Sequence, residues 1–62
     1  MKKNLDERVF ALLKQEGALH FAEIARRLDL YENTASRACY RLTRDGRVQL
    51  KRVGTALVAE VS

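Results

Sequence analysis

The chain contains one cysteine, one histidine and no proline. A single cysteine cannot form a disulfide within the chain, and Cys39 with His20 would supply only two of the four ligands of a structural zinc site. Two common ways of stabilising a small domain are therefore excluded. Hydrophobic residues make up 47% of the composition, and the sequence predicts a fold held together by their packing, with no metal ion and no other cofactor.

Long apolar stretches are absent as well. No run approaches the roughly 20 residues that span a bilayer, and the first basic residues are followed by Asp6, Glu7 and Arg8, where a secretory signal would be apolar. We therefore expect no membrane contact and a cytoplasmic location. At 62 residues the chain has room for one domain, residues 1–62, and is too short for an enclosed cleft, which favours a binding module over an enzyme.

Positive charge is unevenly distributed along the chain. Residues 1–32 carry six basic and six acidic side chains, whereas residues 33–62 carry six basic and two acidic ones, which places the net charge of +4 in the second half. The basic residues of that half are Arg37, Arg41, Arg44, Arg47, Lys51 and Arg52. A localised basic surface is typical of polyanion binding, because each neutralised phosphate releases condensed counterions.

Apolar periodicity predicts two helices in the first half of the chain. Asn4 followed three residues later by Glu7 has the form of a capping box, and apolar residues at helical spacing indicate a helix over residues 5–15. The glycine that follows can close this helix. Residues 18–20 then form a short extended link, which is a candidate strand, and a second amphipathic helix is expected over residues 21–28.

A third helix is predicted over residues 32–44, because one face of this segment is apolar and the opposite face is polar and cationic. The apolar stripe is Ala35, Ala38, Cys39 and Leu42. The polar row is Asn33, Arg37, Tyr40, Arg41 and Arg44. After this helix, alternating apolar residues over 47–51 and a β-prone run over 57–61 predict a hairpin with its turn at 53–55.

Two short helices joined by a three-residue turn, the second with a basic free face, fit a helix-turn-helix that binds DNA. The segments FAEIARRL at 21–28, DL at 29–30, ENTASRA at 32–38 and LTRDGRV at 42–48 resemble bacterial winged-helix regulators of the multiple-antibiotic-resistance type. The resemblance implies an α+β winged helix-turn-helix fold, with three helices followed by a two-stranded wing. It also implies a small transcriptional regulator that binds double-stranded DNA at the nucleoid, with its third helix in the major groove.

Two positions depart from the usual pattern of that family. Asp29 stands where such turns usually carry glycine, and aspartate tolerates a left-handed backbone less well than glycine but better than most residues. Tyr31 precedes the third helix, where Ser or Thr is frequent, and tyrosine is a poor N-cap. We therefore expect either a locally different turn or a contact role for Tyr31.

The candidate DNA contacts divide into residues that read bases and residues that bind phosphates. Arg37 and Arg41 have the reach to bind guanine bidentately or, failing that, to bind phosphates, and Asn33 can bind adenine. The further candidates near the start of that helix are Thr34 and Ser36. The expected phosphate contacts are Arg44, Arg47, Lys51 and Arg52. Ordinary solvated charge is the competing interpretation of the basic residues.

Two other side chains of the third helix have more than one interpretation. Tyr40 fits either a contact with sugar or phosphate or an aromatic side chain packed against the hairpin. Cys39 lies on the apolar stripe, which favours a buried thiol over a redox sensor, because thiol reactivity needs exposure and a lowered pKa. His20 precedes the second helix while Cys39 faces inward, so no catalytic pair is expected. The sequence predicts a protein that is not an enzyme.

Alternative functions remain open at this stage. A winged helix can also serve as a protein-interaction module, although the polar row argues against a large apolar patch. The segment from Arg37 to Tyr40 and the turn at 53–55 are similar to the Zα type, which binds left-handed duplex. That family, however, places Asn where Ser36 stands and has wing prolines that are absent here.

The resemblance extends to small fimbrial phase-variation regulators, which act with a larger DNA-binding partner. One helix in one major groove covers only a few base pairs, and useful specificity therefore requires a second reading unit. We expect a homodimer or a larger regulatory partner on the DNA. No small-molecule effector is expected.

Overall fold

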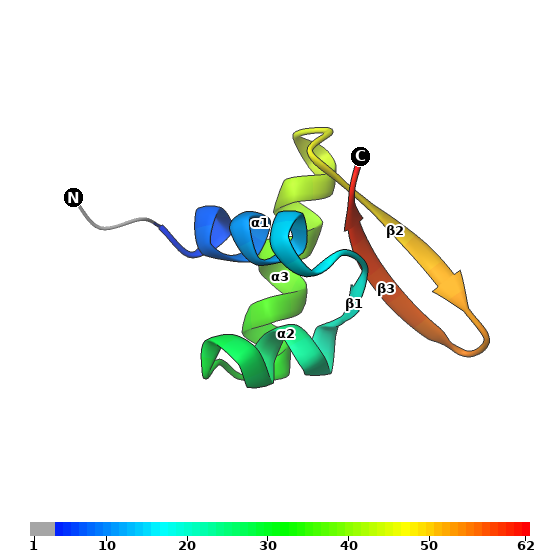
Figure 1. The fold of residues 1–62 in the computed structure, drawn as a ribbon, viewed down its shortest axis with the longest axis horizontal. Helices are drawn as coiled ribbons and strands as arrows, with labels where there is room; N and C mark the ends of the chain where they lie inside the picture. The colour runs from blue at the N-terminus through cyan, green and yellow to red at the C-terminus, as the bar shows by residue number, and fades with distance from the viewer. Residues whose placement is uncertain (1–3) are drawn as a thin grey trace.

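The structure, a computed structural model, describes residues 4–62 and has an α+β architecture of three helices and a three-stranded sheet (Figure 1). The elements are α1 (Leu5–Glu16), β1 (Leu19–His20), α2 (Phe21–Leu28), α3 (Glu32–Arg44), β2 (Val48–Val53) and β3 (Ala56–Val61). This order confirms the predicted fold class, including the short third strand between the first two helices. Lys2 and Lys3, the first basic residues, lie outside the described residues.

The start and end of α1 are fixed by backbone groups that find specific partners. The Asn4 side-chain oxygen accepts a hydrogen bond from the Glu7 backbone N–H at 2.8 Å, which confirms the predicted N-cap. At the other end, Gly17 has φ 88° and donates its N–H to the Leu13 carbonyl at 2.9 Å. The helix runs one residue further than predicted, to Glu16.

The turn between α2 and α3 is built around a left-handed aspartate. Asp29 has φ 57° and ψ 52°, and the N–H groups of Asp29 and Leu30 both donate to the Ala25 carbonyl, which closes α2. Tyr31 occupies the N-cap position of α3 with an extended backbone and no hydrogen bond from its side chain, which is 85% exposed. Asp29 therefore serves in place of glycine, and Tyr31 is left free for contacts.

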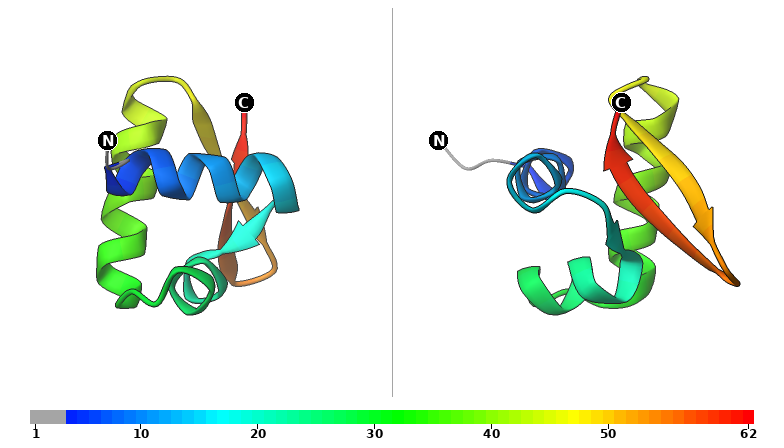
Figure 2. Two further views of the ribbon diagram at one scale, coloured as in Figure 1. Left: turned by 60° about the vertical axis from the view of Figure 1, so that its left-hand side comes forward. Right: turned by 45° about the vertical axis from the view of Figure 1, so that its right-hand side comes forward.

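The sheet has the strand order β1-β3-β2 with antiparallel pairing throughout. Val53 pairs with Ala56, which leaves only Gly54 and Thr55 in the hairpin turn. The predicted turn at 53–55 was therefore wrong by one residue, because Val53 belongs to the strand. Gly54 has φ 64°, a conformation that β-branched residues rarely adopt, and this turn extends the wing away from the helices (Figures 1 and 2).

The core lies between α3, the other two helices and the inner face of the sheet. All four residues of the predicted α3 stripe are fully buried, and Val9, Leu13 and Ile24 meet them from α1 and α2. Three of the four stripe residues are small, namely Ala35, Ala38 and Cys39, which allows the helices to approach α3 closely. Because this face of α3 is buried, the opposite face is available to a partner. No helix within residues 4–62 is long and apolar enough to cross a membrane.

Candidate nucleic-acid interface

The outward face of α3 carries a continuous polar row. Successive residues of a helix are offset by about 100°, which places Asn33, Arg37, Tyr40 and Arg44 opposite the buried stripe, and all four are exposed. Within residues 4–62, neither the Arg37 nor the Arg44 side chain forms an ion pair or hydrogen bond. Two guanidinium groups on this face are therefore ready to bind an external acceptor.

Thr34 and Ser36 lie at the margins of this row and are half-buried. The Ser36 hydroxyl donates to the Asn33 carbonyl at 3.0 Å, so its proton is used within the helix. Thr34 lines a shallow hollow of about 520 Å³ with residues 29–31 of the turn. The side chain of Ser36 therefore has only its oxygen lone pairs free, whereas Thr34 faces the turn.

Tyr40 is held at the surface by an aromatic neighbour. Its ring meets that of Phe21 at an interplanar angle of 60°, with the centroids 5.9 Å apart, while half of the residue stays exposed. The ring contact seen here joins α3 to the start of α2, whereas the packing interpretation had placed this ring against the hairpin. The contact leaves Tyr40 partly exposed and gives its ring a defined position.

Arg41 is turned toward α1 and bound by Asp6. The guanidinium Nη2 donates to Oδ1 at 2.8 Å and Nε donates to Oδ2 at 3.0 Å, a two-pronged arrangement. This hydrogen bonding raises the pKa of the Arg41 guanidinium. Arg41 is exposed, as predicted, but its Nε and one edge of its Nη2 already donate to Asp6.

Arg47 is also bound to the first turn of α1. Its Nη1 donates to the Glu7 carboxylate at 2.7 Å, and its guanidinium carbon lies 4.0 Å from the centre of the Phe10 ring. The hydrogen bond to Glu7 raises the pKa of Arg47. Both contacts join the segment between α3 and β2 to α1, and Arg47 therefore has a structural role that its sequence position does not reveal.

The wing carries two basic residues, Lys51 and Arg52, both exposed on β2. The Lys51 ammonium lies 3.7 Å from the Glu60 carboxylate, which also accepts a hydrogen bond from Gln49 at 2.9 Å. Arg52 has no ion pair within the described part of the chain. On the wing, the Arg52 guanidinium is therefore available for DNA, and the Lys51 ammonium is only weakly paired with Glu60.

The internal ion pairs concentrate the remaining positive charge on α3 and the wing. On α2, Arg26 and Arg27 bind Glu23, and the hydrogen bond from Arg26 is the main cause that lowers the pKa of Glu23. In the second half of the chain, α1 carboxylates pair with two of the six cations and Glu60 lies near a third. The cations of residues 33–62 that lack an internal partner are Arg37, Arg44 and Arg52.

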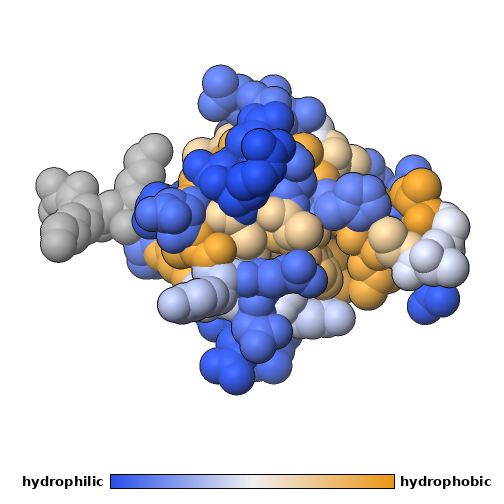
Figure 3. Space-filling model, turned by 90° about the horizontal axis from the view of Figure 1, so that it is seen from below, coloured by the Kyte–Doolittle hydropathy of each residue, from blue (hydrophilic) through white to orange (hydrophobic). Residues whose placement is uncertain are grey.

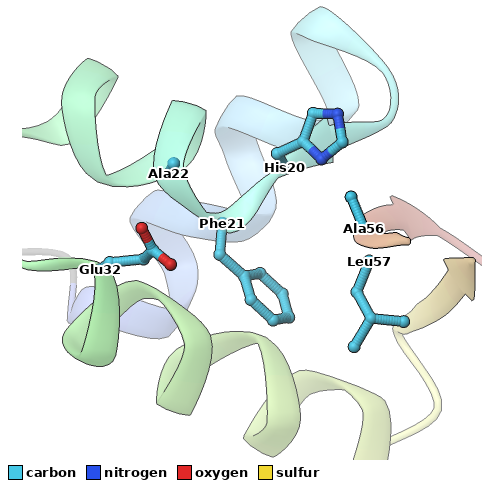
Figure 4. A pocket seen from close by; sticks show the side chains of 6 residues that line it. All are labelled: His20, Phe21, Ala22, Glu32, Ala56 and Leu57. Atoms are coloured by element: carbon cyan, nitrogen blue, oxygen red, sulfur yellow. The ribbon is translucent and has the colours of Figure 1, made fainter. Parts of the chain in front are cut away.

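A second hollow, of about 290 Å³, lies between the start of α2, the start of α3 and β3. Its lining residues are His20, Phe21, Ala22, Glu32, Ala56 and Leu57. In the close view the Phe21 ring points toward the hollow and the His20 ring is turned away from it (Figure 4). In the view from below, hydrophobic residues lie between two clusters of hydrophilic residues (Figure 3).

Cys39 is fully buried on α3, as predicted. Burial, with a smaller contribution from the Asp6 carboxylate, raises the pKa of the Cys39 thiol to about 11. A thiol in this environment stays protonated at neutral pH and is a poor nucleophile. No group of three or more His, Cys, Asp or Glu side chains within residues 4–62 is arranged to hold a metal ion.

Comparison with solved structures shows the same fold in several proteins. YusO from Bacillus subtilis superposes with a TM-score of 0.87 at 20% identity, over 92% of this chain and 43% of that chain. The Zα domain of PKZ from Carassius auratus, in complex with Z-DNA, has a TM-score of 0.83 at 23% identity. The match covers 92% of this chain and 90% of that domain. HlyU from Vibrio cholerae has a TM-score of 0.72 at 27% identity, and the match covers 90% of this chain and 63% of HlyU.

The chain spans less than half of YusO, and at 20% identity this likeness concerns the fold alone. No curated protein matches the chain. Residues 3–49, more than half of the chain, match a family model described as winged helix-turn-helix DNA-binding. Together with the three helices and the antiparallel wing, this match shows that the chain belongs to the winged helix-turn-helix DNA-binding family.

Proposed function

We propose that this domain recognises a specific sequence of right-handed double-stranded DNA and acts as a small transcriptional regulator, not as an enzyme. The observation that supports this most directly is the outward face of α3, where Asn33, Tyr40 and two unpaired guanidinium groups share one exposed side. A helix of this kind fits the major groove. The wing lies beside it and supplies further positive charge.

The proposed contacts follow from which side chains are free. Arg37 lies in the middle of the row and has the geometry to bind guanine through O6 and N7, while Asn33 binds adenine. Thr34 and Ser36 add contacts near the start of α3. The proposed phosphate contacts are Arg44, Lys51 and Arg52. Arg41 and Arg47 can also bind phosphates, but only after their ion pairs with Asp6 and Glu7 have broken.

Specificity requires a second reading unit. One helix in one groove contacts only a few base pairs, whereas two domains on a two-fold site double the sequence that is read. We propose that the domain binds DNA in the cytoplasm as a homodimer or beside a larger regulatory partner. Either arrangement is consistent with the family, since its modules commonly bind as pairs.

The test is selection of bound duplexes from a random pool, followed by sedimentation of the complex to count subunits. Enrichment of a defined right-handed site, bound much more tightly than random DNA, is the expected result. A CG-repeat duplex held in the left-handed form at low salt by cytosine methylation, and monitored by circular dichroism, serves as the control. Preference for that duplex would overturn the proposal in favour of left-handed recognition, and absence of binding to any duplex at low salt would leave a protein-interaction module.

A further inference from the structure

The ion pair between Asp6 and Arg41 lies at the edge of the proposed DNA-binding face. Arg41 follows Arg37 by four residues, which places it about 6 Å further along α3 and about 40° around it. Its guanidinium thus belongs to the exposed side of the helix, yet its donors point to Asp6 at the start of α1. Arg37 and Arg44, one turn before and after it, carry no such partner.

We propose that Asp6 withholds Arg41 from DNA, so that a carboxylate of the protein and a phosphate of the duplex compete for one guanidinium. This inference rests on the proposed function. In the free protein Arg41 is neutralised by Asp6. When a duplex approaches, Arg41 reaches a phosphate only by leaving Asp6, and the free energy of that ion pair is then lost.

Asp6 and a phosphate bind Arg41 with similar free energies, because the Asp6–Arg41 pair is partly exposed to water. The side chains of Arg41 and Asp6 are 49% and 24% exposed, and ion pairs that contact water contribute little and are weakened further by salt. A phosphate offers the same two-pronged acceptor geometry as a carboxylate. Asp6 therefore lowers the affinity for DNA without abolishing it.

Arg47 provides a contrast within the same protein. Glu7 binds it as Asp6 binds Arg41, but the Arg47 guanidinium also stacks on Phe10 at 4.0 Å and is less exposed. Its position is thus supported by two contacts rather than one. Arg41 is therefore released from its carboxylate more readily than Arg47 is.

The test is the Asp6→Asn variant, which keeps the size of the side chain and removes its charge. We expect about two- to fivefold tighter binding to both selected and random duplex, because an exposed pair couples its partners only weakly. The gain has to disappear when Asp6→Asn is combined with Arg41→Gln, since the released guanidinium is its cause. Glu16→Gln is the matched control. It removes one negative charge from the same helix but leaves Arg27 bound to Glu23, and we expect a smaller gain from it.

Each outcome has a distinct meaning. If Asp6→Asn binds duplex no more tightly than Glu16→Gln does, Asp6 does not withhold Arg41 from DNA. The same conclusion follows if the gain in affinity persists when Asp6→Asn is combined with Arg41→Gln. In both cases the proposed DNA binding itself stands. Failure of the unaltered protein to bind any duplex at low salt overturns the proposed function instead. Circular dichroism confirms that each variant is folded at the temperature of the assay. Asp6→Ser, which also removes the charge and keeps a small polar side chain, is used if Asp6→Asn is not folded.

Discussion

The rings of Tyr40 and Phe21 meet at 60° with their centroids 5.9 Å apart, which links the exposed face of α3 to the first residue of α2. The contact supports Tyr40 from one side while half of the residue remains exposed. The two interpretations of Tyr40, a DNA contact and a packing residue, are therefore compatible. The hydroxyl and the ring make separable contributions.

Two substitutions at Tyr40 distinguish those contributions. We expect Tyr40→Phe to leave the free energy of unfolding almost unchanged and to weaken duplex binding by about 0.5–1.5 kcal/mol, the usual contribution of one hydrogen bond. Tyr40→Ala also removes the aromatic pair and should destabilise the domain by at least a further ~1 kcal/mol. Thermal unfolding and duplex titration measure the two effects. Unchanged affinity of Tyr40→Phe would exclude a hydrogen bond between the Tyr40 hydroxyl and DNA.

The burial of Cys39 predicts a loss of stability at high pH. Its thiol has a pKa of about 11 in the folded protein, above the ordinary value of 9.0. The protonated form is thus favoured by folding, and this contribution to stability is fully present below pH 9 and is lost as the pH rises toward 11. Two pKa units correspond to about 2–3 kcal/mol.

Cys39→Ala isolates this effect from the titration of lysine and tyrosine. The variant should be about 1 kcal/mol less stable at pH 7, through lost packing, yet show a shallower decline of stability between pH 9 and 11. Its affinity for DNA at pH 7 should be unchanged. Unfolding in denaturant across this pH range provides the measurement, and parallel declines for both proteins would contradict burial of the thiol.

The wing predicts a salt-dependent effect that does not depend on sequence. Replacing Lys51 and Arg52 together by alanine should weaken binding to selected and random duplexes alike and reduce the salt slope by about 1 to 2. Most of the reduction should come from Arg52, since Lys51 already lies 3.7 Å from Glu60. Titrations at several salt concentrations measure the slope. A changed base preference with an unchanged slope would show that these residues read bases.

Periodicity in the sequence predicted the helices and the exposed face of α3 well, because the buried side of a helix contains every third or fourth residue. The stripe that includes Ala35 and Leu42 is fully buried, and the polar row is exposed on the opposite side. The hairpin was predicted with an error of one residue at Val53. Whether a valine continues a strand depends on its cross-strand partner, which local pattern does not reveal.

The partners of Arg41 and Arg47 could not be predicted in this way. Asp6 and Glu7 are 35 and 40 residues away in sequence, and their proximity depends on how α1 crosses α3. Amphipathic spacing indicates which face of a helix is buried, but not which charged residue of a neighbouring helix lies beside its edge. The one available signal was the pair of adjacent acidic residues, Asp6 and Glu7, in the first turn of the first predicted helix.

Arg37 provides the sharpest test of sequence recognition. It lies in the exposed row, away from the buried stripe, and has no internal ion pair within residues 4–62, so Arg37→Ala should leave stability within about 0.5 kcal/mol of the unaltered protein. If Arg37 binds guanine in the major groove, the substitution costs about 1–3 kcal/mol on a selected site and much less on random DNA.

Arg41→Ala is the control for Arg37→Ala, because it lies one turn further along the same helix and is bound by Asp6. We expect it to cost less than Arg37→Ala on the selected site and to reduce affinity similarly for selected and random duplexes. Titration of both variants on both duplexes, with circular dichroism to confirm folding, gives the comparison. A folded Arg37→Ala variant that selects the same site with the same affinity would exclude base reading by Arg37, and recognition would then depend on other residues of α3.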